Sequence, residues 1–371
     1  MKIKITNIEI SSTMFLLIFS CTLGLAPFIS IKISGIDSYF SVLFGSILGL
    51  LPLCIILYLF NYQIDKPINE KTKIIFGKLV GTIINYLTIP FLFILGITYL
   101  FNLSNFVISQ YLTNTPLLII IIVISLTSLF VANKGIKVIT KTSSIYSIII
   151  IIVFLIAVLG LFKEIKLDNL KPILEFGLKK PLIAGLVNTL SFTSPIYTIL
   201  FIPKKEVENN TKTKKHFIIT YLISMIIIFF IAIITSSILG KYLLQTYQYP
   251  VYITLKRISL FNFIDRIENF LSFQWILSGI TVIAISIYSI SENIKNNGSK
   301  LINLIVTILM IISSYLLFKN NTSFNEYLYT IYPYLLLPIS IIYVIIFIGA
   351  VIQKNINNSI ILKIKHIILL Q

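Results

Sequence analysis

Two clusters of glycine, proline and hydroxyl residues interrupt long apolar stretches of this chain, and they are the parts of the sequence best suited to bind a ligand. The first cluster is Gly24-Leu25-Ala26-Pro27, and the second is Ser191-Phe192-Thr193-Ser194-Pro195. Glycine permits a sharp turn, whereas proline removes a backbone donor and prevents a helix from continuing. Each cluster therefore predicts a helix that breaks inside a membrane, where the freed backbone groups must face protein or a cavity.

Helices broken in this way can bind a small zwitterion. A half-helix that begins at mid-membrane presents unpaired N–H groups and the positive end of its dipole, which suit a carboxylate. The half-helix that ends there presents carbonyl oxygens, which suit an ammonium group. We therefore predict a site for a small amino acid, with these contributions from the two clusters: Gly24, Leu25, Ala26, Pro27, Ser191, Thr193 and Ser194. The alternative is that the two prolines only kink packed helices.

Two further apolar stretches carry polar residues along one helical face each and would form the walls of the same site. The first face holds Thr98, Asn102, Asn105 and Ser109, and the second holds Ser278, Thr281, Tyr288 and Glu292. Each set follows the spacing of a single helix face. The residues that we predict to line the site are Thr98, Asn102, Ser278 and Thr281. The alternative is that these side chains hydrogen-bond neighbouring helices.

Other kinds of chemistry are disfavoured by the sequence. No carboxylate falls in the middle of an apolar stretch, and the two histidines, His216 and His366, lie near stretch ends. This pattern disfavours a tightly proton-driven pump, an enzyme with paired carboxylates or a catalytic histidine, and a lipid-linked sugar flippase or membrane transferase. No phosphate loop, nucleophile elbow or metal-binding cluster is present. We expect no enzyme activity and no cofactor, and coupling to Na⁺ or H⁺ stays open.

The composition predicts an all-α integral membrane protein. The 371 residues are 57% hydrophobic and 12% charged, with a mean hydropathy of +0.97, and stretches of ~20 apolar residues can cross a bilayer as helices. The expected spans are 10–31, 38–60, 79–108, 116–132, 143–162, 182–202, 216–239, 268–290, 301–318 and 327–352. Residues 1–371 are expected to form one transmembrane domain. Short amphipathic helices are expected near 251–258 and 263–270, and Gly45 and Gly49 form a small-residue face for close helix packing.

The basic residues indicate orientation rather than nucleic-acid binding. The net charge is +17, but the lysines lie in loops between the apolar spans. With the N-terminus in the cytoplasm, 19 of the 30 Lys and Arg residues fall on the cytoplasmic side, as the positive-inside rule requires. The sequence therefore predicts a multi-pass membrane protein with both termini cytoplasmic.

The region after the seventh span resembles a known family. Its residues are Tyr249-Pro250, Leu255-Lys256-Arg257-Ile258, Phe263-Ile264-Asp265-Arg266-Ile267-Glu268 and Trp275. They are similar to the outer-loop signature of the endospore germination permease family, the B subunits of germinant receptors. Weaker matches are Ile10-Ser11-Ser12, Phe76-Gly77-Lys78-Leu79-Val80-Gly81, Lys134-Gly135-Ile136 and Leu170-Lys171-Pro172.

That family is similar to the amino acid-polyamine-organocation transporter superfamily. The resemblance implies a LeuT-like fold, a five-plus-five inverted repeat with broken helices one and six, with repeat one at about 1–165 and repeat two at about 172–371. It implies a small germinant such as an amino acid and partner A and C receptor subunits. It also implies a location in the bacterial cell membrane, which is the spore inner membrane where the organism sporulates. A stand-alone amino-acid transporter is the alternative. The second cluster lacks the acidic residue expected there in many members, which leaves the ligand type open.

Overall fold

The computed structural model describes residues 4–175, 177–208, 211–258, 268–269, 272–295, 299–318 and 320–368, with side chains as far as Ile356. Within these residues the fold is helical, and the sole extended pairing is a parallel bridge between Ile5 and Val207. The α-helices are α1 (Asn7–Phe19), α2 (Ala26–Ser34), α3 (Ser38–Leu48), α4 (Leu50–Asn61), α5 (Ile68–Phe76), α6 (Lys78–Gln110), α7 (Leu117–Asn133), α8 (Ile136–Leu161), α9 (Lys179–Thr193), α10 (Thr213–Thr246), α11 (Pro250–Leu255), α13 (Phe273–Ile294), α14 (Lys300–Leu317), α15 (Asn321–Thr330) and α16 (Tyr332–Ile368).

The helix lengths agree with an integral membrane fold. In the part of the chain that the structure describes, eight helical segments are long and apolar enough to cross a membrane. The first predicted span is divided between α1 and α2, and the span predicted at 116–132 is the shorter helix α7. The count of ten spans and the inverted repeat therefore remain predictions. The amphipathic helix expected near 251–258 corresponds to α11, whereas 263–270 falls largely outside the described residues.

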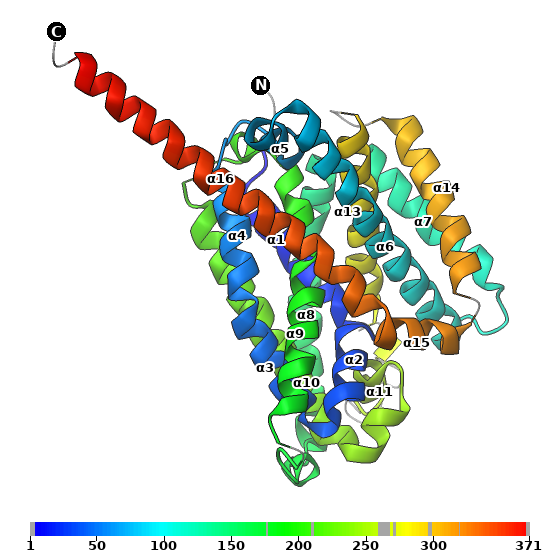
Figure 1. Ribbon diagram of the computed structural model, residues 1–371. Helices are drawn as coiled ribbons and strands as arrows, with labels where there is room; N and C mark the ends of the chain where they lie inside the picture. The colour runs from blue at the N-terminus through cyan, green and yellow to red at the C-terminus, as the bar shows by residue number, and fades with distance from the viewer. Residues whose placement is uncertain are drawn as a thin grey trace.

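α1 and α2 run one after the other through the interior of the bundle (Figure 1). α1 is buried along most of its length, with α8, α10 and α13 among the helices that pack against it. α16 crosses the outer side of the bundle and extends beyond it, at the end where the N-terminus lies (Figure 1). The interrupted helix formed by α1 and α2 is thus surrounded by protein, as free backbone groups at membrane depth require.

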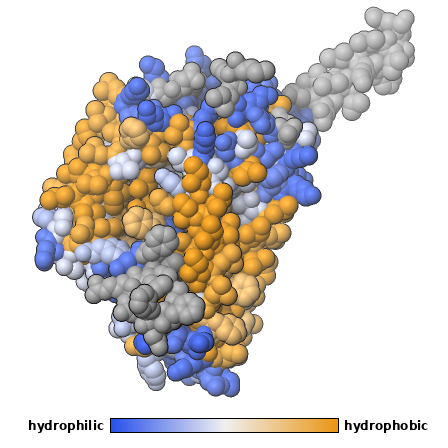
Figure 2. All heavy atoms as spheres, turned by 180° about the vertical axis from the view of Figure 1, so that it is seen from behind, coloured by the Kyte–Doolittle hydropathy of each residue, from blue (hydrophilic) through white to orange (hydrophobic). Residues whose placement is uncertain are grey.

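The surface of the bundle is suited to lipid. Figure 2 shows a broad apolar belt between hydrophilic regions at the two ends of the molecule. Exposed apolar residues include Ile83 and Leu87 on α6, Ile148 and Ile152 on α8, and Leu301 and Leu309 on α14. An exposed apolar area of this extent marks a membrane-facing surface. The chain is therefore a multi-pass membrane protein.

Local signals in the sequence explain where α1 begins. Thr6 and Glu9 form a capping box, in which Glu9 N donates to Thr6 Oγ1 at 3.1 Å and Thr6 N donates to Glu9 Oε2 at 2.8 Å. Just before this cap, Ile5 N donates to Glu206 O and Glu208 N donates to Ile5 O, both at 2.8 Å. These bonds fix the start of α1 against the segment that follows the second cluster.

α3 and α9 pack against each other, and glycines of the two helices lie close together there. A Cβ atom on Gly45 would lie 2.8 Å from Asn188 Cβ and 2.9 Å from Gly185 O. A Cβ atom on Gly49 would clash with the hydroxyl oxygen of Tyr221 on α10. The small-residue face predicted from Gly45 and Gly49 is therefore confirmed as a packing surface.

Replacing Gly45 with alanine is expected to push α3 away from α9. The neighbouring backbone oxygen of Gly185 cannot move aside as a flexible side chain would, so the cost should be about 1–3 kcal/mol. The measurement is thermal unfolding of the purified protein in detergent. Ile47→Ala is the matched control, because Ile47 is 56% exposed on the same helix. Equal unfolding temperatures for the two variants would contradict this account of the contact.

Candidate ligand site at the interrupted helix

The interruption between α1 and α2 is a buried stretch in which the α-helix stops. α1 ends at Phe19, one turn of 3-10 helix follows at Ser20–Thr22, and α2 begins at Ala26. Gly24 has φ +65°, and Leu25 has φ −91° and ψ −83°. Only glycine adopts the left-handed conformation of Gly24 readily. The helix break predicted at Gly24-Leu25-Ala26-Pro27 is therefore confirmed.

The start of α2 is able to bind an anion. Pro27 lies in its first turn, where its missing N–H costs nothing and its fixed φ favours the helix. The other N–H groups of a first turn have no intrahelical partner, and they carry the positive end of the dipole. Because this turn is buried inside the bundle, a carboxylate placed there would be shielded from water.

Two side chains from distant parts of the chain hydrogen-bond the interruption. Asn102 on α6 donates from Nδ2 to Leu23 O at 2.6 Å, which satisfies one of the carbonyl groups that the break leaves without a helical partner. Trp275 on α13 donates from Nε1 to Thr22 Oγ1 at 2.9 Å. Within the described residues, the Oδ1 atom of Asn102 is buried and has no hydrogen-bond partner. Asn102 thus supports the break and leaves an acceptor beside it.

An aromatic group covers the interruption. The ring of Tyr249 lies against Gly24, where a Cβ atom would be 2.7 Å from Tyr249 Cδ1. Phe106 contacts the rings of Tyr249, Tyr252 and Trp275 at centroid distances of 5.1, 5.2 and 5.8 Å. These edge-to-face contacts are favourable arrangements for aromatic rings. They separate the break from the end of the bundle that carries α11.

The second cluster changes the type of helix without unwinding the chain. α9 ends at Thr193, and a 3-10 helix continues over Pro195–Phe201. Ser194, between them, keeps helical dihedral angles of −57° and −43°. The hydroxyls of Ser191, Thr193 and Ser194 donate to carbonyl oxygens one turn earlier on α9. The two clusters are thus not equivalent breaks, because proline here tightens the helix instead of ending it.

The two predicted polar faces mainly bond protein. Thr98 Oγ1 lies 2.9 Å from the hydroxyl oxygen of Tyr327 on α15. Ser278 and Thr281 donate to Trp275 O at 3.2 Å and Leu277 O at 2.9 Å within their own helix. Hydroxyl groups in membrane helices commonly bond in this way. Of the four wall residues that we predicted, Asn102 is the one with a hydrogen bond to the interruption among the described residues.

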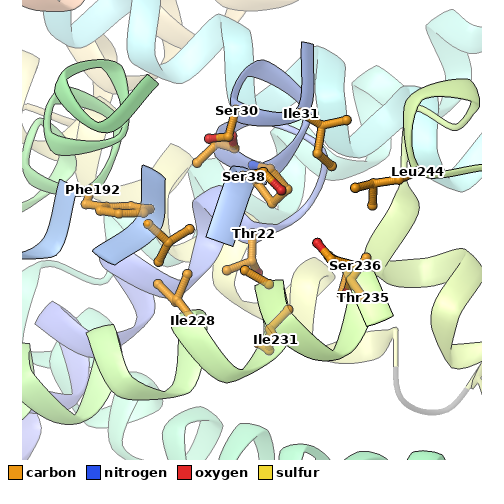
Figure 3. Close-up of a pocket in the computed structure, with 15 residues that line it drawn as sticks. Thr22, Ser30, Ile31, Ser38, Phe192, Ile228, Ile231, Thr235, Ser236 and Leu244 are labelled. Carbon is orange, nitrogen blue, oxygen red and sulfur yellow. The ribbon is translucent and has the colours of Figure 1, made fainter. Parts of the chain in front are cut away.

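A small cavity adjoins the start of α2, on the side of α10 (Figure 3). Ala26 and Pro27 from the first cluster line it, together with Phe192 from α9. Hydroxyl groups in the lining belong to Thr22, Ser30, Ser38, Thr235 and Ser236. Ser236 Oγ is buried without a partner among the described residues. The cavity volume is about 20 Å³, which is room for one water molecule, so a larger ligand would require the surrounding helices to move.

The sequence did not indicate Thr22, Trp275, Ser30 or Ser236 as site residues. Trp275 and Tyr249 belong to the outer-loop signature that carried the family resemblance, but that resemblance did not place them beside the helix break. Thr22 and Trp275 are separated by 253 residues, so no local pattern could have paired them. Ser236 lies on α10, where we predicted no polar face.

Comparison with known proteins agrees with this architecture. Residues 4–322 match the family described as Spore germination protein (Spore_permease). The chain is 24% identical over 270 residues to Spore germination protein KB of Bacillus subtilis (strain 168), with 70% of each chain covered. It is 22% identical over 279 residues to Spore germination protein XB of Bacillus anthracis, with 75% of this chain and 77% of the relative covered. It is 26% identical over 269 residues to YndE of Bacillus subtilis (strain 168), with 70% and 71% covered.

The fold also has a counterpart among solved structures. Mhp1, a nucleobase-cation-symport-1 family transporter in a closed conformation with bromovinylhydantoin bound, superposes with a TM-score of 0.60 at 16% identity, covering 87% of this chain and 74% of Mhp1. The all-helical, LeuT-like fold is therefore shown by the comparison.

Proposed function

Because the chain belongs to the spore germination protein family of permeases, we propose that it is the membrane-embedded subunit of a germinant receptor and binds a small amino acid at the interruption between α1 and α2. Family membership and the transporter fold support a permease-like role rather than an enzyme. The proposal adds the ligand class, the position of its site and the receptor assembly. Partner A and C subunits would complete the receptor, in the spore inner membrane, with both termini of this chain in the cytoplasm.

The observation that carries the proposal is the buried, non-helical backbone at Leu23–Leu25. Its positive side is the first turn of α2, which suits a carboxylate. Its acceptor side includes the unpartnered Oδ1 of Asn102, which suits an ammonium group. The residues that line the adjoining cavity carry no charge. A ligand with a net charge would lack a counter-ion there, whereas a zwitterion carries its own.

The residues that we propose for the site differ in how directly they would contact the ligand. Gly24, Leu25, Ala26 and Pro27 would provide the backbone contacts, and Asn102 an amide contact. Thr98, Ser191, Thr193, Ser194, Ser278 and Thr281 would contribute after a rearrangement that releases hydroxyls from their carbonyl partners. The two inverted repeats would provide that rearrangement by tilting one bundle against the other.

The test is equilibrium binding of glycine, L-alanine, L-serine and L-valine to the purified full-length protein, by calorimetry or scintillation proximity. We expect at least one to bind, and its N-acetyl and carboxamide derivatives to bind at least about tenfold more weakly, because each loses one charged group. Asn102→Leu should weaken binding by a similar factor. Ser104→Ala is the matched control, because Ser104 lies on the same helix outside the predicted polar face and its hydroxyl donates to Leu100 O at 2.7 Å.

Two outcomes would overturn the proposal. One is that no amino acid binds, and the other is that derivatives without the ammonium or carboxylate group bind as well as the parent. An unchanged affinity in Asn102→Leu would remove Asn102 from the site.

A stand-alone amino-acid transporter is the second candidate, favoured by the likeness to a transporter of known structure. Uptake of a labelled amino acid into vesicles that contain only this chain would support it. Binding without uptake would support the receptor subunit.

A further inference from the structure

A second, larger cavity lies between α1, α8 and α10, away from the residues that line the first one. Its volume is about 190 Å³, compared with about 20 Å³ for the cavity beside α2. Ser11 and Ser12 on α1, Ser147 on α8, and His216 and Thr220 on α10 line it. This volume accommodates several water molecules or a group of the size of a phosphate.

The polar groups of this cavity have unused hydrogen-bonding capacity. Ser11 is 6% exposed, and its Oγ atom is buried without a partner among the described residues. Ser12 Oγ accepts a hydrogen bond from Ser147 Oγ at 2.9 Å. Neighbouring hydroxyls on the same helices do have partners: Thr13 donates to Glu9 O, and Ser143 donates to Ile139 O. A buried hydroxyl without a partner is costly, so a ligand that accepts from it would stabilise the fold.

The charge around the cavity favours an anion. Its lining contains one imidazole, four hydroxyls and no carboxylate. α10 begins at Thr213, so His216 and the exposed Lys214 and Lys215 lie in its first turn. Basic side chains there add to the positive end of the helix dipole. Hydroxyl and imidazole donors beside such a helix start match the acceptor oxygens of a phosphate group.

The rim of the cavity is formed by exposed apolar side chains. Ile8, Ile151 and Ile223 line it and are 65%, 39% and 45% exposed. A soluble anion would gain nothing from these side chains, whereas an acyl chain would cover them. We propose that this groove binds the phosphate group of a membrane phospholipid, with Ser11, Ser12, Thr220 and His216 as donors and an acyl chain along the three isoleucines.

A lipid bound in this groove would connect α1, the first half of the interrupted helix, to α10. Ser11 and Ser12 lie on α1, whereas His216 and Thr220 lie on α10. A phosphate that accepts from both sides holds α1 against α10, and thereby restricts motion of the interruption that α1 leads into. Bound lipid should therefore raise the unfolding temperature of the protein.

The experiment uses the full-length protein, purified and stripped of lipid in detergent. Phosphatidylglycerol, diacylglycerol with the same acyl chains, and inorganic phosphate are added separately, and native mass spectrometry and thermal unfolding are recorded. We expect phosphatidylglycerol to bind and raise the unfolding temperature, and the other two to do neither. Ser11→Val combined with His216→Leu should weaken phosphatidylglycerol binding about tenfold or more.

Ser128→Ala is the matched control, because Ser128 is buried on α7 and its hydroxyl donates to Ile124 O; its phosphatidylglycerol affinity should equal that of the unmodified chain. If the double variant does not fold, His216→Leu alone tests the proposal at a half-buried position. Three results would each overturn the proposal. Diacylglycerol could bind as well as phosphatidylglycerol, or inorganic phosphate alone could produce the full rise in unfolding temperature. The third is an unchanged phosphatidylglycerol affinity in the His216→Leu variant.

Discussion

Gly24→Ala is expected to abolish amino-acid binding and to destabilise the protein by about 2–4 kcal/mol. The left-handed φ of +65° costs a non-glycine residue about 1 kcal/mol or more. The added Cβ would also lie 2.7 and 2.9 Å from two ring carbons of Tyr249 and 3.2 Å from Gln248 O. Relief would require the ring to leave its contacts with Phe106, at a further cost of about 1–3 kcal/mol. Thermal unfolding and amino-acid binding measure the two effects.

Gly177→Ala separates the two contributions. Gly177 also has a positive φ, +72°, but a Cβ atom there would meet nothing within 4 Å. Gly177→Ala should therefore lower the stability only by the backbone strain and leave ligand binding unchanged. If Gly24→Ala were no more destabilising than Gly177→Ala, the contact between Tyr249 and the interruption would not contribute to stability. Tyr249→Leu in the Gly24→Ala background should recover part of the loss, because it removes the clashing ring.

The break at Gly24 could be predicted because its cause is local. Glycine followed closely by proline inside an apolar stretch sets backbone conformations that do not depend on distant residues. The belt of exposed isoleucine and leucine follows from composition in the same way. Asn102 was found from helical spacing, although its partner, Leu23 O, could not be read from that spacing.

The remaining features of the site depend on tertiary contacts. Pro195 could end a helix or tighten it, and the structure shows the second outcome with Ser194 still helical. The sequence pattern places Ser278 and Thr281 on one face of a helix. Their hydroxyls nevertheless donate to carbonyl oxygens of that same helix. The cavity is lined in part by Ser236 of α10. Ser236 stands in the run Thr235-Ser236-Ser237, and three consecutive hydroxyl residues do not mark one face of a helix.

A second large effect is expected from Lys71, which is fully buried on α5 between α4 and α6. Its Nζ donates to Leu59 O at 2.7 Å and to Phe60 O at 3.4 Å. These carbonyls belong to the last turn of α4, where the helix dipole favours a cation. Burial, and secondly the nearby Lys204 ammonium, lower the pKa of Lys71 to about 7. In the unfolded chain a lysine pKa is about 10.4.

The pH dependence follows from the difference between these two pKa values. Between about pH 7 and pH 10 the unfolded chain binds more protons at Lys71 than the folded protein does. The free energy of unfolding should therefore rise with pH over this window, by at most about 1.4 kcal/mol per pH unit from this group. Below about pH 7 both states are protonated, and the contribution of Lys71 should be constant.

Lys71→Met tests this assignment by removing the titrating group while keeping a side chain of similar length. We define the difference as the unfolding temperature of the unmodified chain minus that of the variant. It should become more positive as the pH rises from 7 to 9.5, because only the unmodified chain gains stability from Lys71. Lys66→Met is the control: the Lys66 side chain is 45% exposed and pairs with Glu70 at 3.0 Å, so the difference for this variant should not change with pH. A Lys71→Met difference that is constant from pH 7 to 9.5 would show that the buried ammonium keeps its proton. In that case the two α4 carbonyls, rather than burial, would determine its ionisation.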